Sequence, residues 1–384
     1  SQTMPQEIFI GRRNELESIK DPKGPNIVYG GRQLGKSALL KKARKDIDHN
    51  QNKDRAVLVD IKDLDYRAVA KKITETLYDE GILAESDITE NWSELSRSIR
   101  NRLRSEENKI PYLLLLLDEA DAFLESCEAI GYTPFDALKE IQSMEGNRFK
   151  FIVAGLRNVV RFNQKILANN TVLPHMSSLT VKPFNSVEAT ELLEMPLRYL
   201  GFRFERDEET QRLISTILNT TNYFPGMLQL YCSKLIQSMQ YDYAGYDENE
   251  TPPYHVSRNH IKKTLADDTL RNQIREKFDI TLHVGQDDYY YLIALLGAFH
   301  CYNYQSSSFS AQDILQHAKD YEIVKLASLP VNAIHALMEE MRDLNVLQSV
   351  KDGDYRFTRE NFRVMMGSSL EEVDDKILEV AGNE

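Results

Sequence analysis

The chain has 384 residues, of which 42% are hydrophobic, and its 59 acidic against 47 basic residues give a formal net charge of −12. This length favours two or three domains, because single hydrophobic cores stop growing near about 250–300 residues. The acidic balance argues against a protein whose main surface is a nucleic-acid groove, since such binding rests on neutralising phosphates, although it leaves room for a local basic patch.

Cysteine usage and hydropathy indicate the compartment. Cys127, Cys232 and Cys301 are far apart and odd in number, so they indicate neither a disulfide framework nor a zinc site, and a reducing, cytoplasmic setting fits best. The longest apolar run, residues 113–117, is far shorter than the ~20 residues that a membrane span needs, and we expect no membrane contact. The chain has no apparent signal peptide and begins with Ser1 rather than Met, from which we expect a piece of a longer protein.

In the first half, short apolar runs alternate with segments of helical periodicity. The expected strands are 26–29, 55–62, 111–117, 149–154 and 178–181. The expected helices between them are 36–44, 66–80, 92–104 and 136–144. Such alternation predicts βαβ crossovers and a parallel sheet, and therefore an α/β fold.

The character of the sequence changes after Pro183. Helices are expected at 186–199, 207–218 and 225–240 without strands between them, followed by a loop or linker at 241–255 and a charged helix at 260–278. Further helices are expected at 287–299, 310–319 (with Ser310 as N-cap) and 331–344, before a hairpin at 347–357 that turns at Asp352-Gly353. Three helices and a hairpin are the winged-helix order. We therefore expect three domains, with a core at 1–184, a helical lid and linker at 185–280, and a winged helix at 281–384.

The stretch GGRQLGKS at residues 30–37 fits the pattern G-x-x-x-x-G-K-[ST]. Gly30 allows a sharp turn after the strand, and Gly35 allows the backbone to approach phosphate oxygens. Lys36 is expected to reach the β- and γ-phosphates, and Ser37 to offer its hydroxyl to Mg²⁺. The other residues of the expected cradle are Gly31, Arg32, Gln33 and Leu34. The alternative is a glycine-rich turn, but the strand before it and the helix after it favour a phosphate cradle.

Two acids follow the apolar run directly. A buried strand would deliver Asp118 and Glu119 to the carboxyl edge of the sheet, where ligands of α/β proteins bind. Asp118 would hold the Mg²⁺ shell, and Glu119 would polarise the attacking water. Alone, such acids are often solvated turn residues; with the upstream loop they favour a site. We expect Asp121 to be a helix-start carboxylate.

Several motifs of the sequence together resemble those of one protein family. GGRQLGKS, LLLLLDEAD and the strand order are similar to P-loop ATPases of the additional-strand class, which includes AAA+ and STAND proteins. IFIGRRNEL at 8–16, FIVAGLRNV at 151–159 and TNYFPGMLQLYC at 221–232 resemble segments of the STAND group, and residues ~285–370 resemble its winged helix. The resemblance implies a P-loop NTPase sheet with helices on both faces, a helical lid and a winged-helix domain.

Further residue roles follow from this resemblance alone. Arg157 would sense the terminal phosphate, with Asn158 as its rival, although a surface arginine in a turn is the alternative. Pro225 would contact the adenine side of the nucleotide, and it can equally be a helix N1 proline. The family pattern places a glycine two residues earlier, where this chain has Tyr223. Phe9 and Ile10 would pack near the adenine or belong to the core.

A histidine of the winged helix often contacts the β-phosphate of ADP in this family. His300, His317 and His335 lie in the expected domain. A lone histidine in a helix is more often an ordinary surface or core residue.

The first functional reading is a STAND-type switch with slow ATP hydrolysis. ADP would hold it closed, and ATP would open it for self-association or for a protein partner, in bacterial or archaeal signalling or defence. The alternative is an origin-recognition-like or transposition-helper ATPase that binds DNA. That is disfavoured because the third helix carries Glu339, Glu340 and Asp343 against Arg342. A non-catalytic nucleotide-binding scaffold is a third reading, against which the intact motif residues count.

Overall fold

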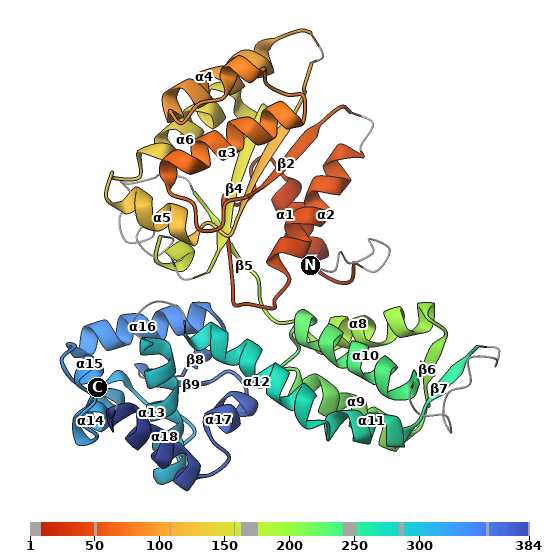
Figure 1. Ribbon diagram of the computed structural model, residues 1–384, viewed down its shortest axis with the longest axis vertical. Helices are drawn as coiled ribbons and strands as arrows, with labels where there is room; N and C mark the ends of the chain where they lie inside the picture. Colours follow the sequence, from red (N-terminus) through yellow and green to blue (C-terminus); the bar gives the residue numbers. More distant parts are fainter. Residues whose placement is uncertain are drawn as a thin grey trace. The chain divides into compact units, whose positions relative to one another are not determined.

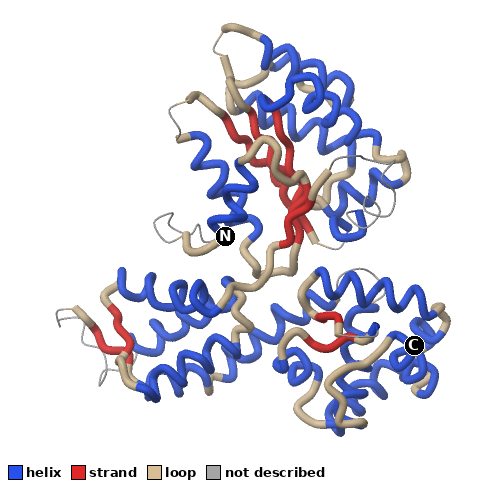
Figure 2. Tube along the Cα trace, turned by 180° about the vertical axis from the view of Figure 1, so that it is seen from behind, coloured by secondary structure: helices blue, strands red, loops and turns tan. Residues whose placement is uncertain are grey.

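The structure is a computed structural model that describes residues 9–49, 52–107, 109–156, 158–162, 176–240, 252–283, 288–350 and 353–382. The chain forms two compact units, which are drawn in Figures 1 and 2. The first unit comprises Ser1–Gly30 and Gly35–Val181, and the second comprises Gly31–Leu34 and Lys182–Glu384.

The first unit is built on a five-stranded sheet in the order β2-β3-β4-β1-β5, in which every pairing is parallel. The strands are β1 (Ile27–Tyr29), β2 (Arg55–Asp60), β3 (Leu113–Asp118), β4 (Phe149–Gly155) and β5 (Ser178–Thr180). The chain thus inserts β4 between β1 and β3. The expected α/β fold with a parallel sheet is confirmed.

Helices cover both faces of this sheet (Figure 1), with α1 and α2 on one face and α3, α4 and α6 on the other. The helices are α1 (Arg13–Lys20), α2 (Lys36–Asp48), α3 (Tyr66–Asp79), α4 (Trp92–Arg104), α5 (Asp121–Glu128) and α6 (Thr133–Glu145). Every residue of β1, β3 and β4 is buried as a result. This burial explains the unbroken apolar run of β3, because a strand covered on both faces has no solvent side that favours polar residues.

A buried lysine anchors α1 to the sheet. The Nζ atom of Lys150, in β4, donates hydrogen bonds to the carbonyl oxygens of Ser18 at 3.0 Å, Ile19 at 2.8 Å and Asp21 at 2.7 Å. These carbonyls lie at the C-terminal end of α1, where backbone acceptors lack helical partners and a cation is favourable. Lys150 therefore fixes the C-terminal end of α1 to β4.

The first part of the second unit is helical, but it also contains a two-stranded parallel sheet. Its elements are α8 (Ser186–Tyr199), β6 (Phe202–Phe204), α9 (Glu208–Thr220), α10 (Pro225–Gln240), β7 (Tyr254–Val256) and α11 (Arg258–Leu265). The expectation of helices without strands was therefore wrong. Both strands have three residues, too few for a visible alternation, and they pair across a long stretch of sequence. Tyr254 and His255, expected in a linker, lie in β7, whereas 241–251 is outside the described residues.

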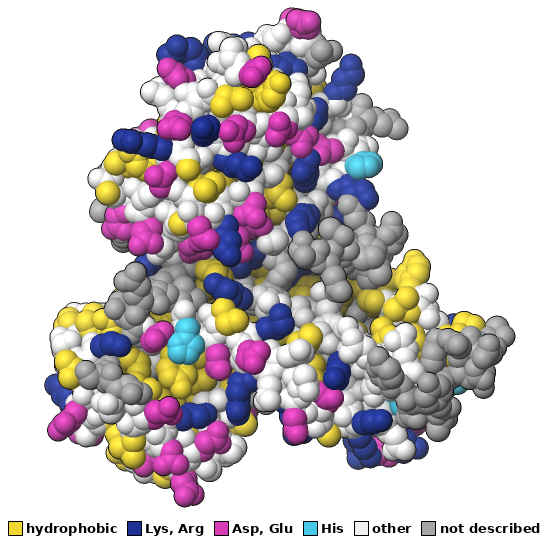
Figure 3. Space-filling model, in the orientation of Figure 1, with side chains coloured by type: hydrophobic (Ala, Val, Ile, Leu, Met, Phe, Trp, Pro, Cys, Tyr) yellow, Lys and Arg dark blue, Asp and Glu magenta, His cyan; other side chains and the backbone are white. Residues whose placement is uncertain are grey.

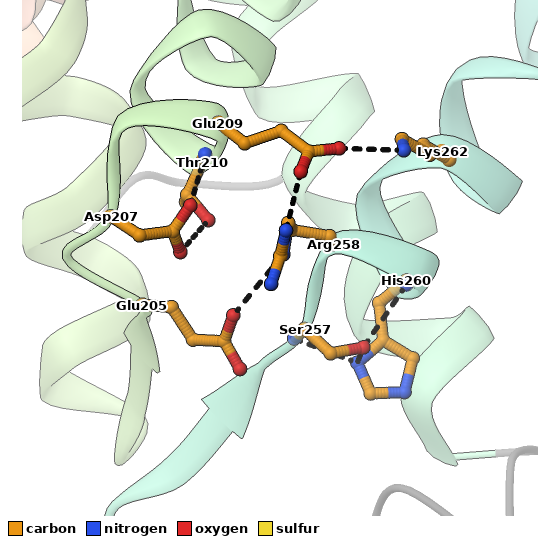
Figure 4. A network of polar contacts seen from close by, with 8 residues as sticks. All are labelled: Glu205, Asp207, Glu209, Thr210, Ser257, Arg258, His260 and Lys262. Carbon is orange, nitrogen blue, oxygen red and sulfur yellow. Dashed lines mark hydrogen bonds and ion pairs between the residues drawn. The ribbon is translucent and has the colours of Figure 1, made fainter.

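A polar network ties α11 to α9 (Figure 4). Glu209 accepts from Lys262 at 2.9 Å and is also paired with Arg258. Ser257 caps α11, and α12 (Asp268–Leu282) begins after its own cap, Asp267, whose carboxylate accepts from the Leu270 amide at 2.8 Å. The single helix expected at 260–278 is therefore two helices, because Asp267 starts a new one.

The C-terminal part of the second unit contains the expected three helices and hairpin in order, together with three helices that were not expected, α15 before the hairpin strands and α17 and α18 after them. Its elements are α13 (Tyr289–Asn303), α14 (Ala311–Asp320), α15 (Val324–Ala327), α16 (Val331–Asp343), β8 (Leu347–Ser349), β9 (Tyr355–Phe357), α17 (Glu360–Met366) and α18 (Leu370–Gly382). Ser310 caps α14 as expected, and β8 pairs antiparallel with β9. The expected turn residue Asp352 lies outside the described residues. Across the helices that the structure describes, none has the length and apolarity to cross a membrane.

Candidate nucleotide-binding site

The glycine-rich loop follows β1 and leads into α2. Gly30 has a φ of 154° and Gly35 a φ of 87°, and a Cβ atom at Gly30 would lie 2.4 Å from the carbonyl oxygen of Val181. Only glycine fits this position without displacing backbone, and Gly35 sits in left-handed conformation as the N-cap of α2. The loop therefore has the sharp turn that the sequence predicted for a cradle.

Lys36 and Ser37 are the first two residues of α2. The Nζ atom of Lys36 donates to the carbonyl oxygen of Gly30 at 2.8 Å, so its side chain folds back along the loop. Both residues are partly exposed. The amides of the first helical turn point out of the helix at this end, where the helix dipole favours an anion.

The middle of the loop belongs to the second unit. Gly31–Leu34 group with that unit, and the Gly226 amide donates to the Gln33 carbonyl oxygen at 3.1 Å. Pro225 is the first residue of α10 and is buried. Arg32 is exposed, whereas Leu34 is a core residue.

Tyr223 stands where the resemblance places a glycine, and its backbone adopts a conformation that favours glycine. Tyr223 has a φ of 61°, in the left-handed region that glycine adopts freely. Its ring also lies 4.5 Å from the guanidinium carbon of Arg359. The sequence alone left the local geometry before Pro225 open; the structure shows a left-handed turn made by a tyrosine, at a cost of about 1–2 kcal/mol.

The two acids lie at the end of β3, as predicted. Asp118 is 7% exposed, and one of its carboxylate oxygens accepts from the Glu119 amide at 3.1 Å. Glu119 is partly exposed and has a φ of 59°. Among the described residues, twelve that are not glycine have a positive φ, so this conformation turns the chain after β3 but does not by itself mark a functional site.

A third loop lies between the other two. The sheet places β4 between β1 and β3, and the Ala120 amide donates to the Ala154 carbonyl oxygen at 2.9 Å. Because all strands are parallel, the segments that follow β1, β3 and β4 leave the same edge of the sheet. This edge is where α/β folds bind ligands.

Asp121 binds two backbone amides of the segment that follows β4, one of them at Asn158, where the helical residues 158–162 begin. Its two carboxylate oxygens accept from the amides of Leu156 and Asn158, both at 2.7 Å. The Asn158 side chain donates to the Asp121 carbonyl oxygen at 3.0 Å and to Glu125 at 3.3 Å. Asp121 does begin α5, as expected, but sequence reasoning missed the clamp. No rule of sequence spacing links Asp121 to Leu156 and Asn158, which follow it by 35 and 37 positions.

Three predicted site residues remain, the phosphate sensor Arg157 and the adenine-side residues Phe9 and Ile10. Arg157, the predicted phosphate sensor, lies outside the described residues. Ile10 is buried and Phe9 half-buried, just before α1. Their roles near the adenine stay predictions.

The three histidine candidates have partners within the second unit. His300 Nδ1 and His317 Nε2 lie 3.0 Å apart, and His335 Nε2 lies 3.1 Å from the Tyr355 hydroxyl. Burial and the neighbouring His300 lower the pKa of His317 below its ordinary value. The structure thus brings two of the candidates together as a pair.

The donor set suits a magnesium nucleotide. Backbone amides and Lys36 match phosphate oxygens, while the Ser37 hydroxyl and the Asp118 carboxylate are the oxygen ligands that Mg²⁺ prefers. At Gly35 no atom lies within 4 Å of the place that a Cβ would take, so the loop backbone is open at this position. The residues present therefore fit the group that the motif implies.

Comparison with known proteins agrees with the fold. No protein-family model matches the chain, and no curated protein sequence does either. The chain is similar to the structure of the Walker-type ATPase paby2304 of Pyrococcus abyssi, with 15% identity and a TM-score of 0.58, over 94% of this chain and 96% of that one. At this identity the likeness shows the fold alone, an α/β P-loop NTPase core with a helical C-terminal part.

Two further similarities are more distant. Cdc6p from Pyrobaculum aerophilum has 12% identity and a TM-score of 0.42, over 98% of both chains. The Drosophila origin recognition complex bound to DNA has 13% identity and a TM-score of 0.44, over 97% of this chain and 88% of that one. Both scores are too low to carry an argument.

Proposed function

We propose that this protein is a STAND-type switch that binds ATP and ADP with Mg²⁺ and hydrolyses ATP slowly. One observation carries the proposal: a glycine-rich loop and two carboxylates follow parallel strands of one sheet and so lie at its carboxyl edge. A bound Mg²⁺ would neutralise phosphate charge and orient the nucleotide.

Each residue has a role in this proposal. Lys36 and the loop amides bind the phosphates, Ser37 and Asp118 hold Mg²⁺, and Glu119 orients the attacking water. Arg157, or its rival Asn158, contacts the terminal phosphate. The residues proposed for the adenine side are Phe9, Ile10 and Pro225.

The switch requires contacts that differ between two states, because a ligand shifts an equilibrium only by its differential affinity. ADP would favour a closed state, and ATP an open one competent for self-association or for a protein partner. Residues of the phosphate loop belong to both units, which supports a role for the loop in such a change.

A DNA-binding ATPase is the second candidate, supported by the helices α13 to α16 and the hairpin that follows them in the C-terminal part. The charges of α16 argue against DNA binding. Arg342 pairs with Glu339 and, at 3.1 Å, with Asp343, so its charge is not available to a phosphate. Figure 3 also shows acidic and basic side chains interspersed on the face it presents. Binding of duplex DNA at moderate salt would favour this candidate over the switch.

The first test is the nucleotide content of the purified protein, measured on the supernatant after denaturation. Near-stoichiometric ADP is expected, because a switch of this kind retains its product. An empty site with rapid turnover of added ATP would contradict the switch.

Two substitutions test the site itself. Lys36→Ala is expected to abolish nucleotide binding, whereas Lys41→Ala, on the exposed face of the same helix, should leave it intact. Glu119→Gln is expected to retain ATP binding and lose turnover. Tight ATP binding by Lys36→Ala would overturn the cradle, and absence of turnover in the wild type would favour a non-catalytic scaffold.

A further inference from the structure

A pocket lies in the C-terminal part of the second unit, and none of its lining residues belongs to the phosphate loop. It has a volume of about 660 Å³ and lies among the end of α13, the β8–β9 hairpin and α17. Small-molecule sites commonly enclose roughly 300–1,000 Å³. We name it the hairpin pocket and define it by Tyr302, Gln348, Arg356, Thr358, Glu360 and Arg363.

The hairpin pocket is locally basic in an acidic chain. It contains two arginines against one carboxylate, Glu360. Arg363 pairs with Glu360, and its guanidinium carbon lies 4.4 Å from the Tyr302 ring. Stacking on an aromatic ring orients a guanidinium without consuming its hydrogen-bond donors.

Arg356 is held from the strand side. In the amide orientation that satisfies both groups, the Gln348 side-chain oxygen accepts from Nη2 of Arg356 at 3.0 Å. The Arg356 side chain is otherwise exposed. Both arginines are therefore oriented by neighbours before any ligand binds, which lowers the entropic cost of binding.

Two polar atoms of the pocket residues lack partners in the described structure. These are Oγ1 of Thr358 and Nε of Arg363, both buried. Buried polar atoms are nearly always hydrogen-bonded, and an exception calls for a ligand or an ordered water. The Arg363 Nε atom can only donate, whereas the Thr358 hydroxyl can donate or accept, so an acceptor would satisfy both atoms.

We propose that the hairpin pocket binds a small molecule that carries an oxyanion, either phosphoryl or carboxylate. Arginine forks match such groups with two parallel hydrogen bonds. The oxyanion would compete with Glu360 for Arg363 and supply the acceptor that the pocket lacks. The volume has room for the rest of a small metabolite as well as for the anionic group.

The pocket is connected to the phosphate loop through α17. On α17, Phe362 stacks on Phe278 of α12 at 4.1 Å, and Asn361 donates to the carbonyl oxygen of Asn219. Just before α17, Arg359 stacks on Tyr223. Tyr223 lies three residues before Gly226, the residue that binds Gln33 of the loop. An anion that moves Arg363 is therefore expected to change nucleotide affinity, a consequence that rests on the proposed function.

The binding test uses calorimetric titration of the full chain with inorganic phosphate, pyrophosphate, citrate and glucose 6-phosphate. The Lys36→Ala background prevents these anions from occupying the phosphate loop. Saturable binding of one or more probes is expected, weakened about tenfold or more by Arg356→Gln. Arg363→Gln should act likewise, and Arg363→Lys should recover part of the loss. Arg212→Gln, an exposed arginine of α9 outside the pocket, is the matched control.

Three results would overturn the proposal. No saturable binding of any probe at millimolar concentration is one, and binding that Arg356→Gln leaves unchanged is another. The third is binding of a DNA duplex that depends on Arg356 when none of the small anions binds. If Arg363→Gln fails to fold, Arg356→Gln still decides the test, because that side chain is exposed.

The coupling is tested separately, by measuring ADP affinity in the wild type with and without a saturating probe. A change of severalfold is expected, and it should disappear in Arg356→Gln. Unchanged ADP affinity would overturn the coupling but not the pocket. Absence of ADP binding in the wild type would contradict the proposed function while the anion titration in the Lys36→Ala background stands on its own.

Discussion

The carboxylate of Asp121, in α5, accepts a hydrogen bond at 2.7 Å from the backbone amide of Asn158, in the segment after β4. Its other oxygen accepts the Leu156 amide at the same distance. One side chain of α5, the helix that follows the two acids, thus holds the backbone at both Leu156 and Asn158.

We predict that Asp121→Ala slows ATP turnover about tenfold or more, with a smaller effect on ADP affinity. The substitution leaves two backbone amides without their acceptor, which costs about 1–3 kcal/mol per buried group, and it frees the segment after β4 from α5. Turnover and ADP affinity, measured side by side, check the prediction. Glu125→Gln, on the same helix, should retain most activity. An equal loss of turnover and ADP affinity would indicate a structural role only.

Gly30 should not tolerate a side chain. In Gly30→Ala, the new Cβ atom would lie 2.4 Å from the Val181 carbonyl oxygen, at a φ of 154°. We therefore expect the loop to shift and nucleotide affinity to fall about tenfold or more. Gly81→Ala is the control, because a Cβ atom there has open space and only a left-handed φ of 67° to accommodate. If a nucleotide titration gave the same affinity for both variants, the close approach of Val181 to Gly30 would not be what requires a glycine there.

The lowered pKa of Lys150 predicts that the stability of the first unit changes with pH in the alkaline range. Burial lowers its pKa from the ordinary 10.5 to about 8, and Asp21 acts in the opposite direction. Between these values the native chain binds fewer protons than the unfolded chain, so the free energy of unfolding of the first unit should rise with pH. Urea denaturation of wild type and Lys150→Met at several pH values measures the difference. A wild-type slope matching that of Lys150→Met would argue against a lowered pKa.

The pair of His300 and His317 predicts that the stability of the second unit falls in the acidic pH range. Burial, followed by the charge of His300, lowers the pKa of His317. The native state then binds fewer protons, so this contribution is complete above the ordinary pKa of about 6.5 and is lost as pH falls toward the native pKa. Asp313 and Asp320 also face His317 and oppose the shift in part. Thermal unfolding of wild type should be more acid-sensitive than that of His317→Gln, with exposed His49→Gln as the control. Parallel profiles would contradict the prediction.

Long elements could be predicted because their signals are local. The bounds expected for 92–104, 186–199 and 225–240 match α4, α8 and α10, since periodicity over several turns and a clear cap or proline mark such helices. The strands β6 and β7 could not, because three residues carry no period and their pairing depends on a partner far along the chain.

The sequence by itself determined the chemistry of the candidate site. A glycine at 30, a glycine at 35, Lys36 and the acids after β3 follow from local rules of turns, helix starts and buried strands. Only the tertiary structure decided which distant residues meet. Insertion of β4 between β1 and β3, the clamp of Asp121 on the segment after β4 and the hairpin pocket all join segments far apart in sequence. Such contacts are selected by packing of the whole chain, and no short window of residues encodes them.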